Sequence, residues 1–250
     1  MRLTVLGAGP AYSDRPDARG ASYLVASGGT RVLLDLGQGS FPALFGHVAP
    51  DAIDAVAITH LHPDHFIDLV PLRHYLRFEF APPRRVRVIG PAALAQRLDA
   101  LHAQPGFTAE SLDTETIGIG EHRIGELRLR AVRVTHTDDS YAIRVAAGDG
   151  PALVYSGDCG RADDIAPLIA PGDTLLSEVA AGAGPVPDGM LHLDGPAVGR
   201  LAAGTGAGRV LLTHLLMRHD PEAAAASVRA AYDGPVEFVW PGSVVDPVEG

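Results

Sequence analysis

The chain has 250 residues, 46% of them hydrophobic, so it can bury the core of one domain spanning residues 1–250. Its formal net charge of -10 argues against a broad nucleic-acid-binding surface, because such a surface must neutralise many phosphates with basic side chains. Lysine is absent, which excludes Schiff-base chemistry and a phosphate-loop lysine. We therefore expect a small-molecule substrate and no long nucleic acid.

The predicted elements begin with strands and continue with helices. Apolar, β-rich runs predict strands over 3–6, 22–26 and 31–34. Apolar residues at helical spacing predict helices over 66–80, 91–102, 195–203 and 221–232. No run is long and apolar enough to cross a membrane, and the amino terminus has no pattern of an export signal. The only cysteine, Cys159, rules out an internal disulfide, so we expect a cytoplasmic protein.

The glycine pair in Gly7-Ala8-Gly9-Pro10 could indicate a dinucleotide-binding loop, because glycines after a first strand let phosphates approach a helix end. No third glycine follows at the required spacing, and the residues after Pro10 do not start a helix. We interpret the segment as a tight loop that borders the functional site.

The most informative segment is Thr59-His60-Leu61-His62-Pro63-Asp64-His65, which places three imidazoles and a carboxylate directly after an apolar run. His60 and His62 share a face if the chain stays extended, and Asp64 and His65 then turn inward from the first bend of a helix. Repulsion between protonated rings makes such a cluster costly unless a cation binds it. The spacing favours two metal ions rather than one.

Three further candidate ligands each follow an apolar run that predicts a strand. They are His136, Asp158 and His214. In layered α/β proteins, strand ends can present polar groups along one edge while the sheet holds them rigidly. We therefore expect these side chains to meet the histidine cluster.

Four stretches of the chain resemble the metallo-β-lactamase superfamily, and more narrowly its ribonuclease Z-like phosphodiesterase branch. They are 1–9, 60–65, Tyr155-Ser156-Gly157-Asp158 and Leu212-Thr213-His214-Leu215. The resemblance covers essentially the whole chain. It implies an α/β fold, namely an αββα four-layer sandwich of two mixed β-sheets flanked by helices.

The resemblance also implies how the ligands divide between two metal ions. One ion would be held by three histidines and the other by an aspartate and two histidines, with an aspartate bridging both: His60, His62 and His136; Asp64, His65 and His214; and Asp158. Zn²⁺ is the expected metal for this histidine-rich set, and Mn²⁺ and Fe²⁺ match the same ligand types. Dimers are common among relatives, which makes a homodimer an open alternative to a monomer.

Two residues outside the metal set have an expected catalytic role. In the branch, a histidine corresponding to His192 lies above the metals, and a glutamate corresponding to Glu178 orients it. The flanking Val179-Ala180 departs from the usual alanine-threonine. The alternative makes His192 a helix-start residue and Glu178 a strand-end charge.

The expected reaction uses a hydroxide that bridges the metals, since one bound zinc already lowers the pKa of water to about 7. The hydroxide attacks phosphorus, and a protonated His192 held by Glu178 stabilises or protonates the leaving group. Asp64 and Asp158 must stay ionised, so we count Asp64 among the catalytic residues as well as the ligands.

The expected substrate is a small or cyclic phosphodiester. The tRNA-processing enzymes of the branch carry a basic arm before the bridging aspartate, whereas residues 136–158 leave room only for a strand pair. The competing hypothesis keeps the metal centre and changes the substrate to a lactone, a thioester or another carboxylic ester, because the same hydroxide can attack a carbonyl.

The remaining polar residues have simpler interpretations. Asp68 either accepts the second ring proton of a histidine ligand or lies solvated on a helix. Asp35 is interpreted as turn chemistry around the first metal, and Cys159 as a small buried thiol. Five histidines are expected on the surface or in packing: His47, His74, His102, His122 and His219.

Overall fold

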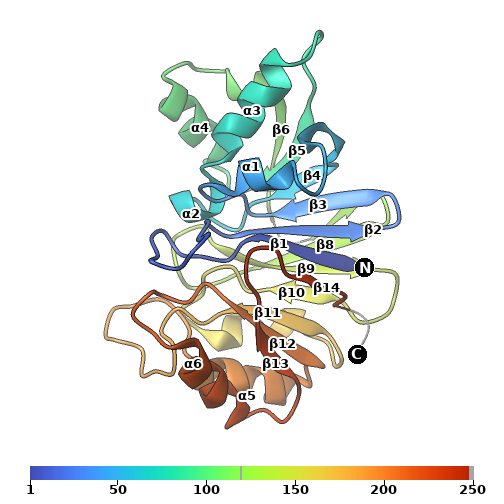
Figure 1. The fold of residues 1–250 in the computed structure, drawn as a ribbon. Helices are drawn as coiled ribbons and strands as arrows, with labels where there is room; N and C mark the ends of the chain where they lie inside the picture. Colours follow the sequence, from blue (N-terminus) through green and yellow to red (C-terminus); the bar gives the residue numbers. More distant parts are fainter. Residues whose placement is uncertain (119, 248–250) are drawn as a thin grey trace.

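Two seven-stranded sheets packed face to face form the body of the protein, in a computed structural model that describes residues 1–118 and 120–247 (Figure 1). The first sheet has the spatial order β14 (Val244–Val245), β1 (Arg2–Gly7), β2 (Ser22–Ser27), β3 (Thr30–Leu34), β4 (Ala55–Ala57), β5 (Val86–Gly90) and β6 (Leu112–Thr116). The second has the order β13 (Val236–Phe238), β12 (Arg209–Thr213), β11 (Thr174–Glu178), β10 (Leu153–Tyr155), β9 (Tyr141–Ala147), β8 (Leu127–Arg133) and β7 (Glu121–Ile124).

Helices cover the outer face of each sheet (Figure 1). The first sheet carries α1 (Ser40–Leu44), α2 (Pro63–Phe66), α3 (Leu69–Phe78) and α4 (Leu94–His102), and the second carries α5 (Gly195–Thr205) and α6 (Pro221–Arg229). Short 3₁₀ helices lie at Pro50–Ala52, Thr108–Glu110, Ala162–Asp164 and Ala166–Leu168. The four layers are the αββα sandwich that the sequence predicts.

Both sheets are mixed in the same way. Strands β14, β1, β2 and β3 pair antiparallel, whereas β3 to β6 pair parallel. In the second sheet, β7 to β10 pair antiparallel and β10 to β13 pair parallel. Parallel neighbours end at the same edge of a sheet. The residues that follow β3 and β4 therefore lie at one edge of the first sheet, and those that follow β10, β11 and β12 lie at one edge of the second.

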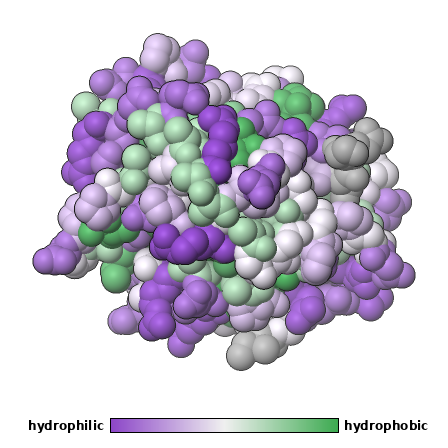
Figure 2. All heavy atoms as spheres, turned by 90° about the horizontal axis from the view of Figure 1, so that it is seen from below, coloured by the Kyte–Doolittle hydropathy of each residue, from purple (hydrophilic) through white to green (hydrophobic). Residues whose placement is uncertain are grey.

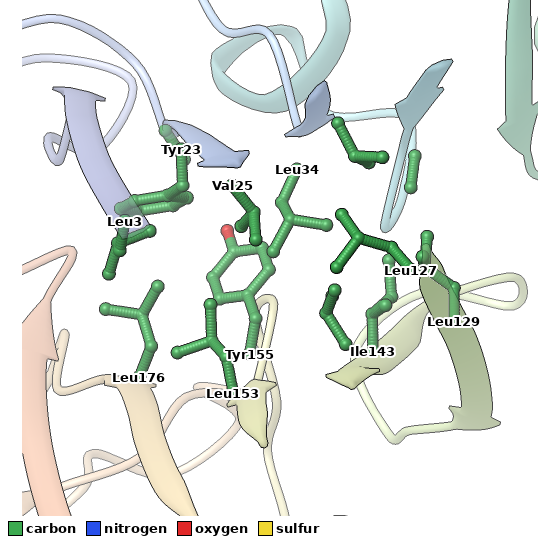
Figure 3. Packing of buried hydrophobic residues seen from close by; sticks show 14 of the residues in the cluster. Leu3, Tyr23, Val25, Leu34, Leu127, Leu129, Ile143, Leu153, Tyr155 and Leu176 are labelled. Carbon is green, nitrogen blue, oxygen red and sulfur yellow. The ribbon is translucent and has the colours of Figure 1, made fainter. Parts of the chain in front are cut away.

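Alternation along the strands sorts apolar side chains between the central core and the outer cores. Leu3 and Val5 of β1 lie in the cluster between the sheets, and Leu6 lies in the cluster under the helices of the first sheet. In β12, Leu211 points into the central cluster while its neighbours pack under α5 and α6. Figure 3 shows side chains of both sheets meeting in this central layer, with Tyr155 reaching toward the first sheet.

The helices differ from their predicted limits in one informative place. The predicted helix over 66–80 corresponds to α3, which begins three residues later, at Leu69, because the turn before it also bonds to a neighbouring segment. Leu36 donates its N–H to the carbonyl of His65, and Asp68 donates its N–H to the carbonyl of Leu36. The other predicted helices are present, with ends shifted by two or three residues.

The face seen from below in Figure 2, at the end of the molecule where α5 and α6 lie, has weakly apolar residues across its middle and hydrophilic residues mainly around its edge. No helix among the described residues combines the length and the apolar character needed to cross a membrane.

Candidate metal centre

The histidine cluster turns inward because the chain changes from strand to helix within it. Beyond β4, Ile58 still donates its N–H to Ile89 of the neighbouring strand. His62 is extended, with φ of -78° and ψ of 141°, and Pro63 begins α2. Proline suits that first helical position, because the missing N–H would have no partner there. His60 is thus presented from the strand end and His65 from the helix.

The structure gathers all seven predicted ligands into two adjoining groups. The three-histidine group contains His60, His62 and His136, and the buried group contains Asp64, His65 and His214; Asp158 belongs to both. Within each group, one potential ligand atom per residue lies within 4.8 Å of the others. Both groups can therefore hold a metal ion, and the shared carboxylate places the two positions side by side.

Asp158 lies at the centre of this arrangement. Its Oδ2 is 3.8 Å from His60 Nε2, 3.6 Å from His136 Nε2 and 3.4 Å from His214 Nε2. Its Oδ1 is 3.3 Å from His65 Nε2. A single carboxylate that faces histidines of both groups is suited to bridge two cations.

The residues present fit a metal pair. The Nε2 atoms of His60 and His65 and the Oδ1 atom of Asp158 are buried without a hydrogen-bond partner. Buried polar atoms of native proteins are normally paired, and each unpaired one costs free energy. Coordination of cations would satisfy all three, and nitrogen and carboxylate donors of this kind suit Zn²⁺.

Without metal, the centre is electrostatically strained. Burial and the neighbouring His65 hold the pKa of His60 well below its usual value. Burial also acts to lower the pKa of His65, but the carboxylates of Asp158 and Asp35 outweigh it and raise that pKa well above its usual value. Burial acts to raise the pKa of Asp158, whereas His214 and His65 bring it well below the usual value. The cluster thus combines the ionised carboxylate of Asp158 with a neutral His60 and a His65 whose second proton a bound cation would displace.

Asp35, directly after β3, holds the cluster from beneath. Its Oδ2 accepts hydrogen bonds from His65 Nδ1 at 2.7 Å, Thr59 Oγ1 at 2.8 Å and the Tyr155 hydroxyl at 2.8 Å. Its Oδ1 accepts from the Thr59 N–H at 2.7 Å. Its positive φ of 57° agrees with the predicted turn, but the prediction was incomplete, because the direct histidine partner of Asp35 belongs to the buried group.

Asp68 is not that partner. Its carboxylate accepts the N–H of Phe41 at 2.8 Å, at the start of α1, and burial raises its pKa. Neither predicted alternative holds, since Asp68 contacts no histidine ligand and is not fully solvated. It ties two helices together.

The other ligands are fixed by backbone contacts. His136 donates from Nδ1 to the carbonyl of Leu191 at 2.8 Å, which leaves Nε2 for the centre. His214 has a positive φ of 55°, and its N–H bonds to the carbonyl of Ala8. The glycine-containing loop after β1 therefore borders the centre, as predicted. Gly157, just before Asp158, has φ of 57°, and a Cβ there would lie 2.8 Å from the Tyr141 carbonyl.

His192 lies beside the centre and is held by Glu178. The distance from His192 Nδ1 to Glu178 Oε1 is 2.9 Å, and the ring centroid of His192 is 4.9 Å from that of His136. Glu178 also accepts the N–H groups of Cys159 and Ala180. Burial acts to lower the pKa of His192, but the Glu178 charge and hydrogen bond raise it to about 9. Glu178 therefore favours a cationic ring at neutral pH in the metal-free protein.

The alternative roles for these two residues are not what the structure shows. The residue that caps α5 is Asp194, whose side chain accepts the N–H of Ala197, so His192 does not start the helix. Glu178 ends β11, but it is buried and its carboxylate is hydrogen-bonded to His192 and to two backbone N–H groups. The predicted contact between the pair is confirmed.

Sequence reasoning missed three residues beneath the ligands. They are Asp35 as a histidine partner, Thr59 and Tyr155. The sequence did contain a signal for Asp35, because it directly follows β3, the parallel neighbour of β4, and His60 lies shortly after the end of β4. The predictions for Cys159 and for the five remaining histidines are confirmed. Cys159 is buried, and the five histidines lie outside both metal-binding groups.

Three comparisons place the chain among known proteins. Residues 30–215 match the model of the β-lactamase superfamily domain. The chain is 32% identical to an uncharacterized protein of Mycobacterium leprae, covering 98% of this chain and 88% of that protein. It is 31% identical to ribonuclease Z of Mycobacterium marinum, covering 78% and 72%.

A solved structure agrees with this placement. The metallo-β-lactamase fold protein YhfI of Bacillus subtilis superposes with a TM-score of 0.87 at 24% identity, covering 98% of each chain. Its sequence carries the name Probable metallo-hydrolase. This chain therefore belongs to the metallo-β-lactamase superfamily, close to YhfI and to the ribonuclease Z-like branch.

Proposed function

We propose that this protein is a hydrolase that cleaves small or cyclic phosphodiesters at a dinuclear metal centre. Family membership and the His/Asp cluster together support a metal-dependent hydrolase. The observation that carries the finer proposal is the imidazole of His192, which is hydrogen-bonded to the buried carboxylate of Glu178 beside two metal-binding groups that share Asp158.

The metal ions would be held by the three-histidine group and the buried group, with Zn²⁺ as the expected ion for these donors. When bound, a cation pair supplies a water activated near neutral pH and positive charge for the oxygens of a transferring phosphoryl group. Asp64, buried at 6% exposure, contributes a carboxylate 3.8 Å from the Nε2 atoms of both His65 and His214. It keeps the buried group anionic and suited to a dication.

His192 would supply the proton for the leaving oxygen. Its Nδ1 is occupied by Glu178, so Nε2 is the ring atom free to face a substrate. A positioned acid of this kind accelerates proton-dependent steps by about 10² to 10⁴. A cationic ring also attracts the negative charge of a phosphodiester, which a neutral lactone or thioester lacks. That difference favours phosphorus over carbonyl substrates.

The chain around the centre suits a small substrate. Between His136 and Asp158 lie only the strands β9 and β10 with their connections, so no arm extends there to hold a folded RNA. The net charge of -10 opposes binding to a long polyanion. A cyclic nucleotide or a related small diester meets both conditions.

The test is an assay of zinc-loaded protein against two panels. One panel contains cyclic nucleotides, dinucleotides and bis(p-nitrophenyl) phosphate, and the other contains lactones, thioesters and carboxylic esters. We expect hydrolysis of diesters that disappears on chelation and returns with Zn²⁺. Turnover confined to the carbonyl panel would show the competing ester hydrolase instead.

A further inference from the structure

Asp35 contacts both halves of the metal centre through one oxygen atom. It is 0% exposed and belongs to neither metal-binding group. Its Oδ2 bonds directly to His65 of the buried group, and through the Thr59 hydroxyl it reaches His60 of the three-histidine group, whose Nδ1 is 3.1 Å from Thr59 Oγ1. One carboxylate therefore lies behind a ligand of each prospective metal.

The directions of these hydrogen bonds follow from the donors available. A carboxylate oxygen only accepts, so the single proton of the Thr59 hydroxyl must point to Asp35. The Thr59 oxygen can then only accept from His60, which places a proton on His60 Nδ1. His65 likewise carries its proton on Nδ1, toward Asp35. With both Nδ1 atoms engaged in this way, Nε2 is the ring atom that each histidine has left to bind a cation, and neither Nε2 has a hydrogen-bond partner.

The two histidines do not receive equal support. His65 donates to a charged carboxylate, and such a bond raises the basicity of the opposite ring nitrogen as a metal ligand. His60 donates to the neutral hydroxyl of Thr59, so the charge of Asp35 acts on it only indirectly, through that hydroxyl. Tyr155 adds a third donor to the same Asp35 oxygen; burial and the Asp35 charge raise the pKa of its hydroxyl well above the usual value, so it remains a donor.

The groups also differ in charge and burial. The buried group contains two carboxylates, Asp64 and Asp158, whereas the three-histidine group contains only Asp158. All four members of the buried group are enclosed, while His62 is exposed and His136 is half-buried. Low solvent access strengthens the attraction between a dication and these carboxylates.

We propose that Asp35 is a positioning residue shared by the two metal sites, acting directly on His65 and through Thr59 on His60, so that the buried group binds the first metal ion and the three-histidine group binds the second more weakly. This inference rests on the proposed dinuclear centre but not on the proposed substrate. Its consequence is a defined order of metal uptake.

The order is tested on metal-free protein titrated with Zn²⁺, followed by calorimetry and by the imidazole resonances in ¹H–¹⁵N NMR. We expect the first equivalent to shift the resonances of His65 and His214, and the second to shift those of the three-histidine group. In the metal-free protein, the ring nitrogen shifts of His60 and His65 should both report protonated Nδ1.

The relay is tested by Thr59→Val, which has nearly the same shape but no hydroxyl. It retains the backbone N–H that bonds to Asp35, while His60 loses its acceptor and can move its proton to Nε2. Loss of such an outer partner typically weakens metal binding about 10- to 100-fold, so we expect that loss for the second zinc alone. Thr59→Ser should restore it, because serine keeps the hydroxyl.

Asp35→Asn provides the matched comparison, since it alters the partner of both rings and should weaken both binding steps. Thermal unfolding of each metal-free variant shows whether the fold is intact. Uptake in the reverse order, equal affinities, or a Thr59→Val effect on both steps or on neither would overturn the inference while leaving the proposed function standing. Absence of any zinc binding would overturn both.

Discussion

Histidine rings gather in two places in this fold, the metal centre and the space between α3 and α4. At the second place, His102 stacks on Phe107 with a centroid distance of 3.9 Å, and His74 lies 5.1 Å from His102. His74 donates from Nδ1 to the carbonyl of Val70, one turn earlier in its own helix. These rings are used as flat, partly apolar packing elements.

The difference between the two clusters lies in their carboxylates and in the state of the ring nitrogens. The rings of the metal centre face Asp158, and two of their Nε2 atoms are buried without a partner. Within residues 1–118 and 120–247, the groups of side chains able to hold a metal all belong to that centre. A dense set of histidines therefore signals a metal only where carboxylates converge on it.

The largest expected effect comes from Asp158→Asn, which removes the charge shared by both groups. We expect loss of both zinc ions and a fall in kcat/KM of about 10³-fold or more, because even a single electrostatic stabiliser is typically worth about 10² to 10³. Metal content by mass spectrometry of the native protein and diester turnover measure this directly.

Asp68→Asn is the matched control, because this carboxylate lies close in sequence to Asp64 but bonds only to backbone N–H groups. The amide oxygen of asparagine can still accept from Phe41. Unchanged zinc content is expected. Retention of both zinc ions by Asp158→Asn would contradict the bridging role.

A smaller effect is expected from His192→Ala, which removes the proton donor and leaves all seven predicted metal ligands in place. Loss of a positioned acid should lower kcat by about a hundredfold with two zinc ions retained. The loss should be greater for a cyclic nucleotide than for bis(p-nitrophenyl) phosphate, because p-nitrophenolate leaves without needing a proton.

His122→Ala controls for the loss of a histidine, since His122 lies on β7 and its partner is Glu115 at 3.7 Å. Equal losses of His192→Ala activity toward both substrates would show that His192 binds charge rather than donating a proton. Loss of zinc in His192→Ala would place the ring among the ligands.

The sequence predicted the ligands well because the segments that carry them follow strands whose ends are set by local signals. His60, Asp158 and His214 come after β4, β10 and β12, and apolar runs in the sequence predict all three strands. The contacts beneath them could not be read in the same way, because Asp35 and Tyr155 lie on different sheets and meet only through sheet-on-sheet packing. Such packing depends on the distance between the sheets, which has no periodic trace in the sequence.

The break between α2 and α3 teaches the same lesson at the level of secondary structure. Apolar spacing over 66–80 is helical throughout, and the break arises from backbone bonds of His65 and Asp68 to Leu36, which is about thirty residues away. Gly37 explains why that segment can come so close, since a Cβ there would lie 1.9 Å from the Asp64 carbonyl.

The third prediction concerns the charge of His192 in metal-free protein. Its pKa is raised to about 9 chiefly because Glu178 opposes the effect of burial, so Glu178→Gln should lower it substantially. The imidazole C–H resonances followed by NMR from pH 5 to pH 10 would report the shift. Glu121→Gln, on an exposed strand far along the same sheet, should leave the titration of His192 unchanged.

The same shift has a consequence for stability. Because the folded pKa lies above the ordinary value of 6.5, the pair stabilises the fold fully below that pH and loses its contribution as the pH rises through about 9. The unfolding free energy of the wild type should therefore fall more than that of Glu178→Gln across this window. Parallel curves for the two proteins would mean that Glu178 does not hold the charge of His192.

The smallest expected effect belongs to the packing cluster. His102→Ala should lower the unfolding free energy by about 0.5 to 1.5 kcal/mol, the usual contribution of an aromatic contact beyond its buried area, with zinc content and turnover unchanged. Urea unfolding of metal-free protein measures the loss, and Leu101→Ala, at an exposed position of the same helix, controls for helix propensity. If His102→Ala instead reduced zinc content, the rings between α3 and α4 would bind zinc without converging carboxylates. The distinction drawn between the two clusters would then be wrong.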